Sequence, residues 1–222
     1  MDERAIQIQV KGATVQGDLV VPQGARRIVL FAHGSGSSRS SPRNTYVADV
    51  LHQAGIATLL FDLLTQDEER EDMYTARLRF DIELLATRLL AATERVLGDG
   101  SLRGLTLGYF GASTGAAAAL VAAARRPDIV GAVVSRGGRP DLAESWLPHV
   151  KAPTLLIVGG KDQQVLEMNR DALGKLQGEK ELSIVPGATH LFEEPGALEQ
   201  VATLAREWFV QHLKLSTERQ EK

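Results

Sequence analysis

The sequence contains no cysteine. This absence excludes disulfide bonds, thiolate zinc sites and cysteine nucleophiles. A strong charge of one sign is also missing, since 25 Lys and Arg residues stand against 28 Asp and Glu residues, for a formal net charge of −3. Proteins that bind nucleic acids usually carry a marked excess of basic residues, so this balance favours no nucleic-acid partner.

Long apolar runs are lacking as well. The longest, "GAAAALVAAA" at 115–124, is far shorter than the roughly 20 residues that a helix needs to cross a bilayer. The first ten residues, "MDERAIQIQV", contain no apolar segment of the kind found in secretory signals. No group of His, Asp and Glu residues has the spacing of metal ligands. We therefore expect a cytoplasmic protein with no membrane partner, no metal and no cofactor.

Short apolar runs alternate with longer amphipathic segments along the 222 residues, a pattern typical of a sheet with crossover helices. The first two runs alternate polar and apolar residues and predict an antiparallel pair, whereas the later runs are continuous, as in strands buried on both faces. The prediction is an α/β fold with an eight-stranded, mostly parallel sheet. The expected strands are 5–12, 14–22, 27–34, 56–63, 105–111, 129–138, 152–160 and 181–187, and the expected helices are 42–54, 76–97, 114–126, 165–177 and 196–213.

No internal repeat, linker or shift in composition divides the chain, so we expect residues 1–215 to form a single domain. The charged segment 65–74, "TQDEEREDMY", is interpreted as a solvated surface loop. The last residues, 216–222, are expected to fray.

One serine lies at an abrupt bend between a strand and a helix, in "GYFGASTGAAA" at 108–118. A hydroxyl becomes a useful nucleophile only when a base removes its proton and the backbone exposes its oxygen. A strained strand-to-helix turn gives this exposure, and glycines two positions to either side let the two backbones approach each other. A Gly-x-Ser-x-Gly pattern also arises by chance in a glycine-rich chain, but here the required strand and helix flank it. Ser113 is therefore the predicted nucleophile.

Five histidines could act as the base for Ser113. His190 follows the last predicted strand and precedes the last helix, at the carboxyl edge of the sheet where open α/β folds bind ligands. It is the predicted base. His33 ends a strand and is expected to fix the following loop by hydrogen bonding. The other three have no such setting: His52 and His212 fall within predicted helices, and His149 precedes a strand without a glycine-rich loop.

An acidic residue should accept the second imidazole N–H and stabilise the imidazolium that forms during attack. Asp162 follows "TLLIVGGK" at a strand end and lies between Ser113 and His190 in chain order. It is the preferred candidate, although it could also serve as a turn or helix-cap residue. Asp141, after the preceding strand, is the alternative, and Asp62 lies farther round the sheet.

Four segments together resemble the α/β-hydrolase superfamily, and in particular its lidless dienelactone-hydrolase-like branch: "VLFAHGSGSS", "GYFGASTGAAA", "PTLLIVGGKD" and "PGATHLFEEPG". The resemblance covers nearly the whole chain and implies the α/β-hydrolase fold without a large cap domain, with a Ser113–His190–Asp162 triad at its nucleophile elbow. It also implies an oxyanion hole formed by the backbone N–H groups of Ser35 and Thr114. Dienelactone hydrolases proper carry a cysteine nucleophile, so this chain departs from them.

The resemblance implies hydrolysis of a small-molecule carboxylic ester, and the short segment 136–151 leaves no room for a cap, so a shallow site is expected. Arg39, Arg43 and Arg136 flank this site and could bind an anionic group of the substrate, because guanidinium pairs with carboxylate or phosphate. Alternatively, these arginines and Arg139 pair with acidic residues and hold loops together.

Four alternatives to an esterase stay open. The same triad could serve a thioesterase, a lactonase or a perhydrolase, and the fold could be kept by a non-catalytic binding domain. Epoxide hydrolases and dehalogenases of this architecture place an aspartate where Ser113 stands, and are therefore disfavoured. The sequence indicates neither the natural substrate nor the oligomeric state.

Overall fold

A computed structural model of the chain describes residues 1–214. All eight predicted strands form and join one sheet, in the order β1-β2-β4-β3-β5-β6-β7-β8. The first two strands are antiparallel to each other and β2 is antiparallel to β4, whereas the remaining neighbours are parallel, as predicted. The strands are β1 (Asp2–Val10), β2 (Ala13–Val21), β3 (Arg27–Ala32), β4 (Ile56–Phe61), β5 (Thr106–Ala112), β6 (Val130–Arg136), β7 (Thr154–Gly159) and β8 (Lys180–Val185).

The burial of the strands explains why the two patterns of apolar residues differ. In β1 the buried residues alternate with exposed ones, because one face of this edge strand meets solvent. Every residue of β4 and of β7 is buried, since helices cover both faces of the central sheet. The continuous apolar runs of β4 and β7 therefore belong to the interior of the sheet. The run at 181–187 is an exception to the prediction, because it forms the edge strand β8, which is largely exposed.

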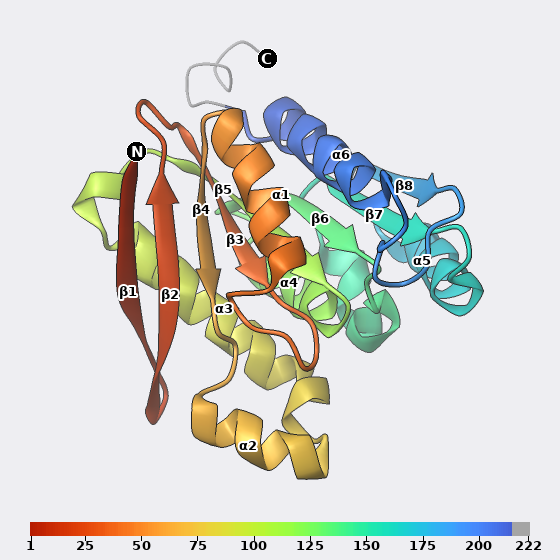
Figure 1. Cartoon of the computed structure of the whole chain (residues 1–222), viewed down its shortest axis with the longest axis horizontal. Helices are drawn as coiled ribbons and strands as arrows, with labels where there is room; N and C mark the ends of the chain where they lie inside the picture. Colours follow the sequence, from red (N-terminus) through yellow and green to blue (C-terminus); the bar gives the residue numbers. More distant parts are fainter. Residues whose placement is uncertain (215–222) are drawn as a thin grey trace.

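Helices pack on both faces of the sheet. Figure 1 shows α1 and α6 in front of it and α3 and α4 behind it, and two separate apolar cores fill these two layers. The helices are α1 (Pro42–Gln53), α2 (Gln66–Thr75), α3 (Ile82–Leu97), α4 (Thr114–Arg125), α5 (Gln163–Lys175) and α6 (Ala197–His212), with the 3₁₀ segments η1 (Leu78–Phe80), η2 (Gly100–Leu102) and η3 (Pro140–His149).

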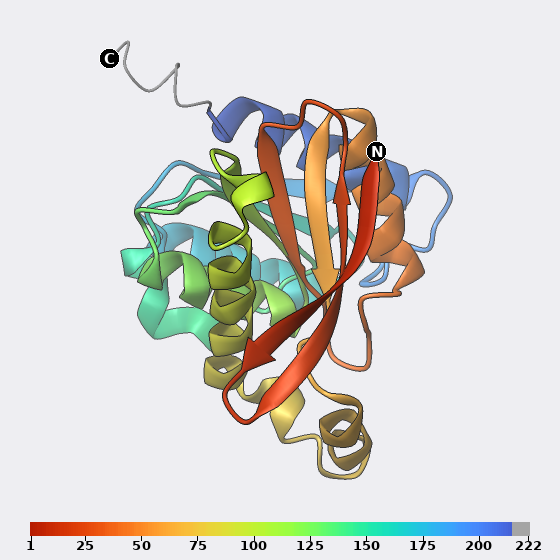
Figure 2. The same ribbon diagram turned by 90° about the vertical axis from the view of Figure 1, so that its left-hand side faces the viewer.

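The composition of the charged segment 65–74 predicts a surface loop, and this prediction is wrong. The segment contains most of helix α2. Thr65 begins this helix with a capping box: its hydroxyl accepts a hydrogen bond from the Glu68 N–H, and the Glu68 carboxylate accepts one from the Thr65 N–H. The buried Arg88 of α3 donates two hydrogen bonds to Glu68, 2.7 and 3.1 Å long. Figures 1 and 2 show α2 projecting beyond the carboxyl ends of β3 and β4. The helix predicted over 76–97 correspondingly begins later, at Ile82, after the short η1.

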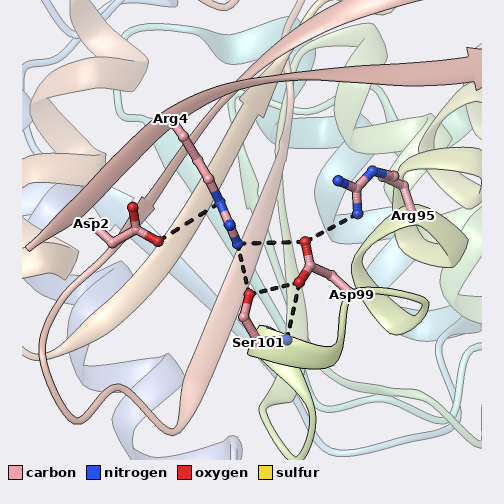
Figure 3. Close-up of polar contacts among 5 residues, drawn as sticks. All are labelled: Asp2, Arg4, Arg95, Asp99 and Ser101. Atoms are coloured by element: carbon pink, nitrogen blue, oxygen red, sulfur yellow. Dashed lines mark hydrogen bonds and ion pairs between the residues drawn. The ribbon is translucent and has the colours of Figure 1, made fainter.

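A polar cluster, which we call the Asp99 cluster, fastens the edge strand β1 to the end of α3. It consists of Asp2, Arg4, Arg95, Asp99 and Ser101 (Figure 3). Arg4 donates to the Ser101 hydroxyl at 2.7 Å and to the Asp99 carboxylate at 3.4 Å, and Arg95 donates to the same carboxylate at 3.1 Å. The hydrogen bond from the Ser101 hydroxyl is the largest of the effects that hold the pKa of Asp99 below its ordinary value.

No helix within residues 1–214 has both the length and the apolar character needed to span a membrane. The expected frayed end, 216–222, lies outside the described residues. The single domain over 1–215 stays a prediction, although the described strands all share one sheet.

Candidate active site

Ser113 occupies a strained turn between β5 and α4. Its φ is 50° and its ψ is −120°, a conformation that side-chain-bearing residues rarely adopt. A Cβ atom at Gly111 would lie 2.4 Å from the Cα of Ala116, and one at Gly115 would lie 2.2 Å from the Ala32 carbonyl oxygen. Only glycine fits at these two positions, so the sequence around Ser113 is shaped by the close approach of strand and helix that the bend requires.

The strained turn is anchored by the neighbouring strand. The Ser113 N–H donates to the carbonyl of Arg136 at 3.2 Å, and the Ser113 carbonyl accepts from the Arg139 N–H at 3.1 Å. Within the described residues, no hydrogen bond ends on the Ser113 hydroxyl. Such catalytic hydrogen bonds often form only in the complex with substrate.

His190 and Asp162 meet at the carboxyl ends of β7 and β8. The Nδ1 atom of His190 lies 2.6 Å from the Oδ2 atom of Asp162, and the His190 side chain is 40% exposed. The structure thus brings together the predicted base and its preferred acid. The alternative acid, Asp141, instead accepts two hydrogen bonds from Arg139, at 2.9 and 2.7 Å.

The loop that carries His190 is fixed at both ends. Before His190, the Thr189 N–H donates to both carboxylate oxygens of Glu194, at 3.0 and 3.1 Å. After it, Phe192 adopts a φ of 56° and is almost completely buried in the core beneath α1 and α6. A Cβ atom at Gly137 would lie 3.5 Å from the Cε1 and Nδ1 atoms of His190. The segment 136–139 therefore contacts both the Ser113 turn and the His190 ring.

The glycine-rich loop after β3 lies beside the Ser113 turn. The hydroxyl groups of Ser35 and Thr114 are hydrogen-bonded at 3.1 Å, and a Cβ atom at Gly34 would lie 3.1 Å from the Ser113 Cβ. Thr114 is the first residue of α4, so its N–H has no partner within the helix. Among residues 1–214, the Ser35 N–H has no hydrogen-bond acceptor either. Two free amides thus flank the nucleophile.

His33 fixes this loop, as the sequence predicts. Its Nε2 atom accepts a hydrogen bond from the Leu63 N–H at 2.9 Å, so the ring proton is on Nδ1 and is donated to the Gly34 carbonyl at 3.0 Å. Burial lowers the pKa of His33, and the hydrogen bond to Gly34 and the charge of Asp62 only partly oppose this effect. The imidazole is therefore neutral at pH 7 and ties the loop to the end of β4.

A cavity of about 480 Å³ lies between this loop and α2. Its lining combines the apolar side chains of Leu63, Leu64, Met73 and Leu85 with serine hydroxyls, Arg43 and charged residues of α2 and η1. The wall formed by α2 was not predicted from the sequence. The T-x-x-E capping box at 65–68 was the signal that could have revealed it.

The α2 wall is held by buried charges. Arg79 donates from Nε to the Asp72 carboxylate at 2.6 Å, and the Leu78 N–H donates to the same group at 2.7 Å. Burial alone would raise the pKa of Asp72, but the hydrogen bonds from Arg79 and the neighbouring amides lower it. Asp72 is therefore ionised at neutral pH, and its ion pair with Arg79 fastens α2 to η1 beside the cavity. The expected shallow and open site stays a prediction.

The arginines around the site differ in their pairing. Arg39 binds Asp62 through its backbone N–H at 2.9 Å and through its guanidinium, which also contacts Asp18 at 3.0 Å. Arg43 approaches the exposed Glu193 at 3.7 Å. Arg136 makes no hydrogen bond or ion pair through its side chain within residues 1–214. No three His, Asp or Glu side chains in this part of the chain are grouped to hold a metal ion.

The sequence and the fold were compared with those of known proteins. Residues 16–214 match the dienelactone hydrolase family. The crystal structure of a dienelactone hydrolase from Anabaena variabilis is 63% identical, with a TM-score of 0.93 over 96% of this chain and 99% of that one. Est1E from Butyrivibrio proteoclasticus is only 17% identical but has a TM-score of 0.79 over 93% of this chain and 98% of its own, which shows a shared fold.

Curated relatives from Mycobacterium tuberculosis are longer. A protein named a putative phosphoribosyl transferase is 58% identical over 211 residues, which are 95% of this chain but 47% of that protein. An uncharacterized protein from the same organism is 30% identical over 75% of this chain and 64% of its own length. The chain therefore spans about half the length of the first of these relatives.

Proposed function

This chain belongs to the dienelactone hydrolase family, and from that premise we propose that it is a serine hydrolase that cleaves small carboxylic esters. The observation that carries the proposal is the pairing of His190 with Asp162 at 2.6 Å, beside a serine held at a strained strand-to-helix turn. Strain of this kind is concentrated at active sites. Membership of the family supports hydrolase activity, and the ester substrate and the roles of the residues are further parts of our proposal.

In the proposed reaction, the Ser113 hydroxyl attacks the ester carbonyl carbon while His190 Nε2 takes its proton. The Asp162 carboxylate holds Nδ1–H and stabilises the imidazolium. The tetrahedral intermediate then collapses, the bond to the alcohol oxygen breaks, and His190 donates its proton to the departing alcohol. A water molecule, deprotonated by His190, attacks the resulting Ser113 acyl-enzyme and releases the carboxylic acid, which restores the serine.

The oxyanion of each tetrahedral intermediate would be bound by the N–H groups of Ser35 and Thr114. Both amides are free within the described residues, and the hydrogen bond between the two hydroxyls links the loop after β3 to the first turn of α4. Loss of one such donor typically costs about 2.7–4 kcal/mol of transition-state stabilisation. The partial positive charge at the beginning of α4 adds to this effect.

The cavity under α2 supports a small-molecule substrate with an apolar portion. A volume of about 480 Å³ is within the range of small-molecule pockets, and Met73 and Leu85 would contact an alkyl or aryl group there. Substrate contacts from Arg39, Arg43 and Arg136 stay a prediction, and Arg39 is the weakest candidate because Asp62 and Asp18 already bind its guanidinium. A cytoplasmic location and the absence of membrane and nucleic-acid partners also stay predictions.

A thioester or a lactone could be cleaved by the same residues, whereas a binding domain would not require an oriented imidazole. The name of the longer mycobacterial relative refers to that whole protein, and we do not extend its transferase activity to this chain.

The test is a panel of chromogenic esters and matched thioesters that vary in acyl length and charge, assayed with the protein and with Ser113→Ala. We expect turnover of short neutral esters and a loss of about 10⁴-fold or more in kcat/KM for the variant. Equal rates for the protein and a correctly folded Ser113→Ala would refute the proposal, and higher kcat/KM on thioesters would reassign the substrate.

A further inference from the structure

Arg136 is a buried arginine that meets no counter-charge within residues 1–214. The residue is 7% exposed overall, and its Nε and Nη1 atoms are shielded from solvent and have no hydrogen-bond partner in this part of the chain. Burial, reinforced by the charge of Arg43, lowers the pKa of Arg136 to about 10. A group with this pKa is still protonated at pH 7, so the buried charge persists.

The position of Arg136 in β6 places its side chain on the face covered by α1 and α6. Val134 and Ala132, two and four residues earlier, belong to the core beneath these helices, and residues two apart in a strand share a face. Ser135 lies on the other face, because a Cβ atom at Gly138 would touch both its Oγ and the Cβ of Ala116 in α4.

The first turn of α1 contributes further unpaired groups. Arg43 Nε and Asn44 Oδ1 are also buried without a partner within the described residues. Ser41, which precedes the helix, makes no capping hydrogen bond through its side chain, so the first N–H groups of α1 keep their partial positive charge. Residues of α1 pack in the same core cluster as the face of β6 that carries Arg136, so Arg43 and Arg136 belong to one layer of the molecule.

Within residues 1–214, a single ion pair involves these cations. Glu193 lies 3.7 Å from Arg43 Nη1, but its side chain is 66% exposed and surrounded by water, which weakens the attraction. In this part of the chain the charge of Arg136 is not balanced by an acidic side chain. A buried charge left in this state is strongly unfavourable unless an ion of opposite sign binds.

We propose that Arg136, Arg43 and the first turn of α1 form a binding site for an oxyanion, namely a carboxylate or a phosphate group. The planar guanidinium matches both groups with paired hydrogen bonds. Asn44 Oδ1 is an acceptor and can bind a hydroxyl next to the anionic group. The site is separate from the proposed oxyanion hole, which uses the amides of Ser35 and Thr114.

The anion would lie close to the nucleophile. Arg136 is paired with Ala112 across β5 and β6, and its carbonyl accepts the hydrogen bond from the Ser113 N–H. Arg43 also lines the cavity under α2. The anionic group can therefore be part of the substrate or can be a free small anion. Use by a substrate rests on the proposed function, whereas binding of the free anion does not.

The first arm of the test measures thermal unfolding of the full chain in a titration with inorganic phosphate, at constant ionic strength set by sodium chloride. We expect a saturable rise of the midpoint, on the order of 5 °C. The rise should disappear in Arg136→Met and shrink in Arg43→Met. Arg139→Met is the matched control and should keep the full response, because its guanidinium is already paired with Asp141.

A midpoint that does not respond to phosphate, or an equal response in Arg136→Met and the unmodified protein, would overturn the proposal. If Arg136→Met fails to fold, the Arg43→Met response decides in the same way. Without phosphate, we expect Arg136→Met to be at least as stable as the unmodified protein, because an unpaired buried charge has been removed.

The second arm identifies the source of the anion. The 4-nitrophenyl esters of butyric acid and of succinic acid share a leaving group and differ by a carboxylate. If the substrate carries the anion, the ratio of kcat/KM for the succinyl and butyryl esters should fall at least about tenfold in Arg136→Met. An unchanged ratio together with the phosphate response assigns the site to a free anion. If neither ester reacts, the proposed function is refuted, whereas the phosphate titration still tests the anion site.

Discussion

Arginines cluster at two corners of this molecule, and their pairing with acidic residues differs between the two. In the Asp99 cluster, at the edge of the sheet, Arg4 and Arg95 converge on one carboxylate that Ser101 also binds (Figure 3). In the second corner, Arg136 at the carboxyl end of β6 and Arg43 in the first turn of α1 meet no buried acid within the described residues.

The backbone N–H groups of the two corners differ in the same way. Beside Asp99, the Ser101 N–H donates a hydrogen bond to the Asp99 carboxylate at 3.0 Å. Beside Ser113, by contrast, the N–H groups of Ser35 and Thr114 are free and the serine itself is strained. Unsatisfied groups and strain reduce stability, so a fold keeps them where they serve a ligand or a reaction. We infer that the first corner stabilises the fold and that the second acts on ligands.

Among the substitutions that distinguish the two corners, replacement of the proposed orienting acid should have the largest effect on kcat/KM. Asp162→Asn should lower kcat/KM by about 10³–10⁴-fold, because the amide neither stabilises the imidazolium nor fixes the His190 tautomer. Asp141→Asn should stay within about threefold, since Asp141 is bound to Arg139. Steady-state kinetics on a short ester measure both. The reverse ranking would move the acid to Asp141.

The wall of the cavity should affect specificity. Met73→Trp narrows the cavity under α2 and should reduce kcat/KM for a six-carbon acyl ester about tenfold relative to the acetyl ester, chiefly through KM. Tyr74→Trp is the matched control, because Tyr74 is 89% exposed and does not line the cavity. If both variants leave the acyl-length profile unchanged, α2 does not contact the substrate.

His33, which holds the loop after β3, should make the free energy of unfolding depend on pH. Burial keeps the pKa of His33 below its ordinary value of 6.5, so the unfolded chain takes up this proton first as the pH falls. The stabilisation is complete above about pH 6.5 and is lost as the pH falls through the folded-state pKa, by at most about 1.4 kcal/mol per pH unit.

Chemical denaturation at pH 7.5, 6.5 and 5.5 measures this dependence. His52 and His212, whose pKa values burial also lowers, add to the slope in the same direction. His33→Gln should therefore reduce the slope without abolishing it. A slope identical to that of the unmodified protein would show that His33 does not contribute to the pH dependence of stability.

The smallest effect should come from the corner that stabilises the fold. Asp99→Asn keeps the shape of the side chain but removes the charge that binds Arg4 and Arg95, and should lower the free energy of unfolding by about 1 kcal/mol. Urea denaturation measures this loss, and kcat/KM should not change. A change in kcat/KM larger than the change in stability would break the contrast between the two corners.

The strands, the order of the chain and the bend at Ser113 could be predicted from the sequence because local patterns encode them. Glycines at 111 and 115 are required by close backbone approach, and apolar runs by burial on both faces. Helix α2 could not be found by the same rule, because it has almost no apolar face and depends on Arg88 and Arg79 for its place.

The ion pairs of the arginines could not be predicted from the sequence either. Arg39 follows β3 and Arg136 ends β6, the two strands that flank β5, yet Arg39 meets Asp18 and Asp62 whereas Arg136 meets no acid within the described residues. Such pairing depends on contacts between residues far apart in the chain, which composition and spacing do not specify.

The most direct test of the central claim is covalent labelling with a fluorophosphonate probe, followed by mass mapping of the modified peptide. We predict one adduct per chain, on Ser113, which forms slowly in Asp162→Asn and not at all in Ser113→Ala. An intact, folded protein that does not react, or an adduct on another serine, would contradict the account.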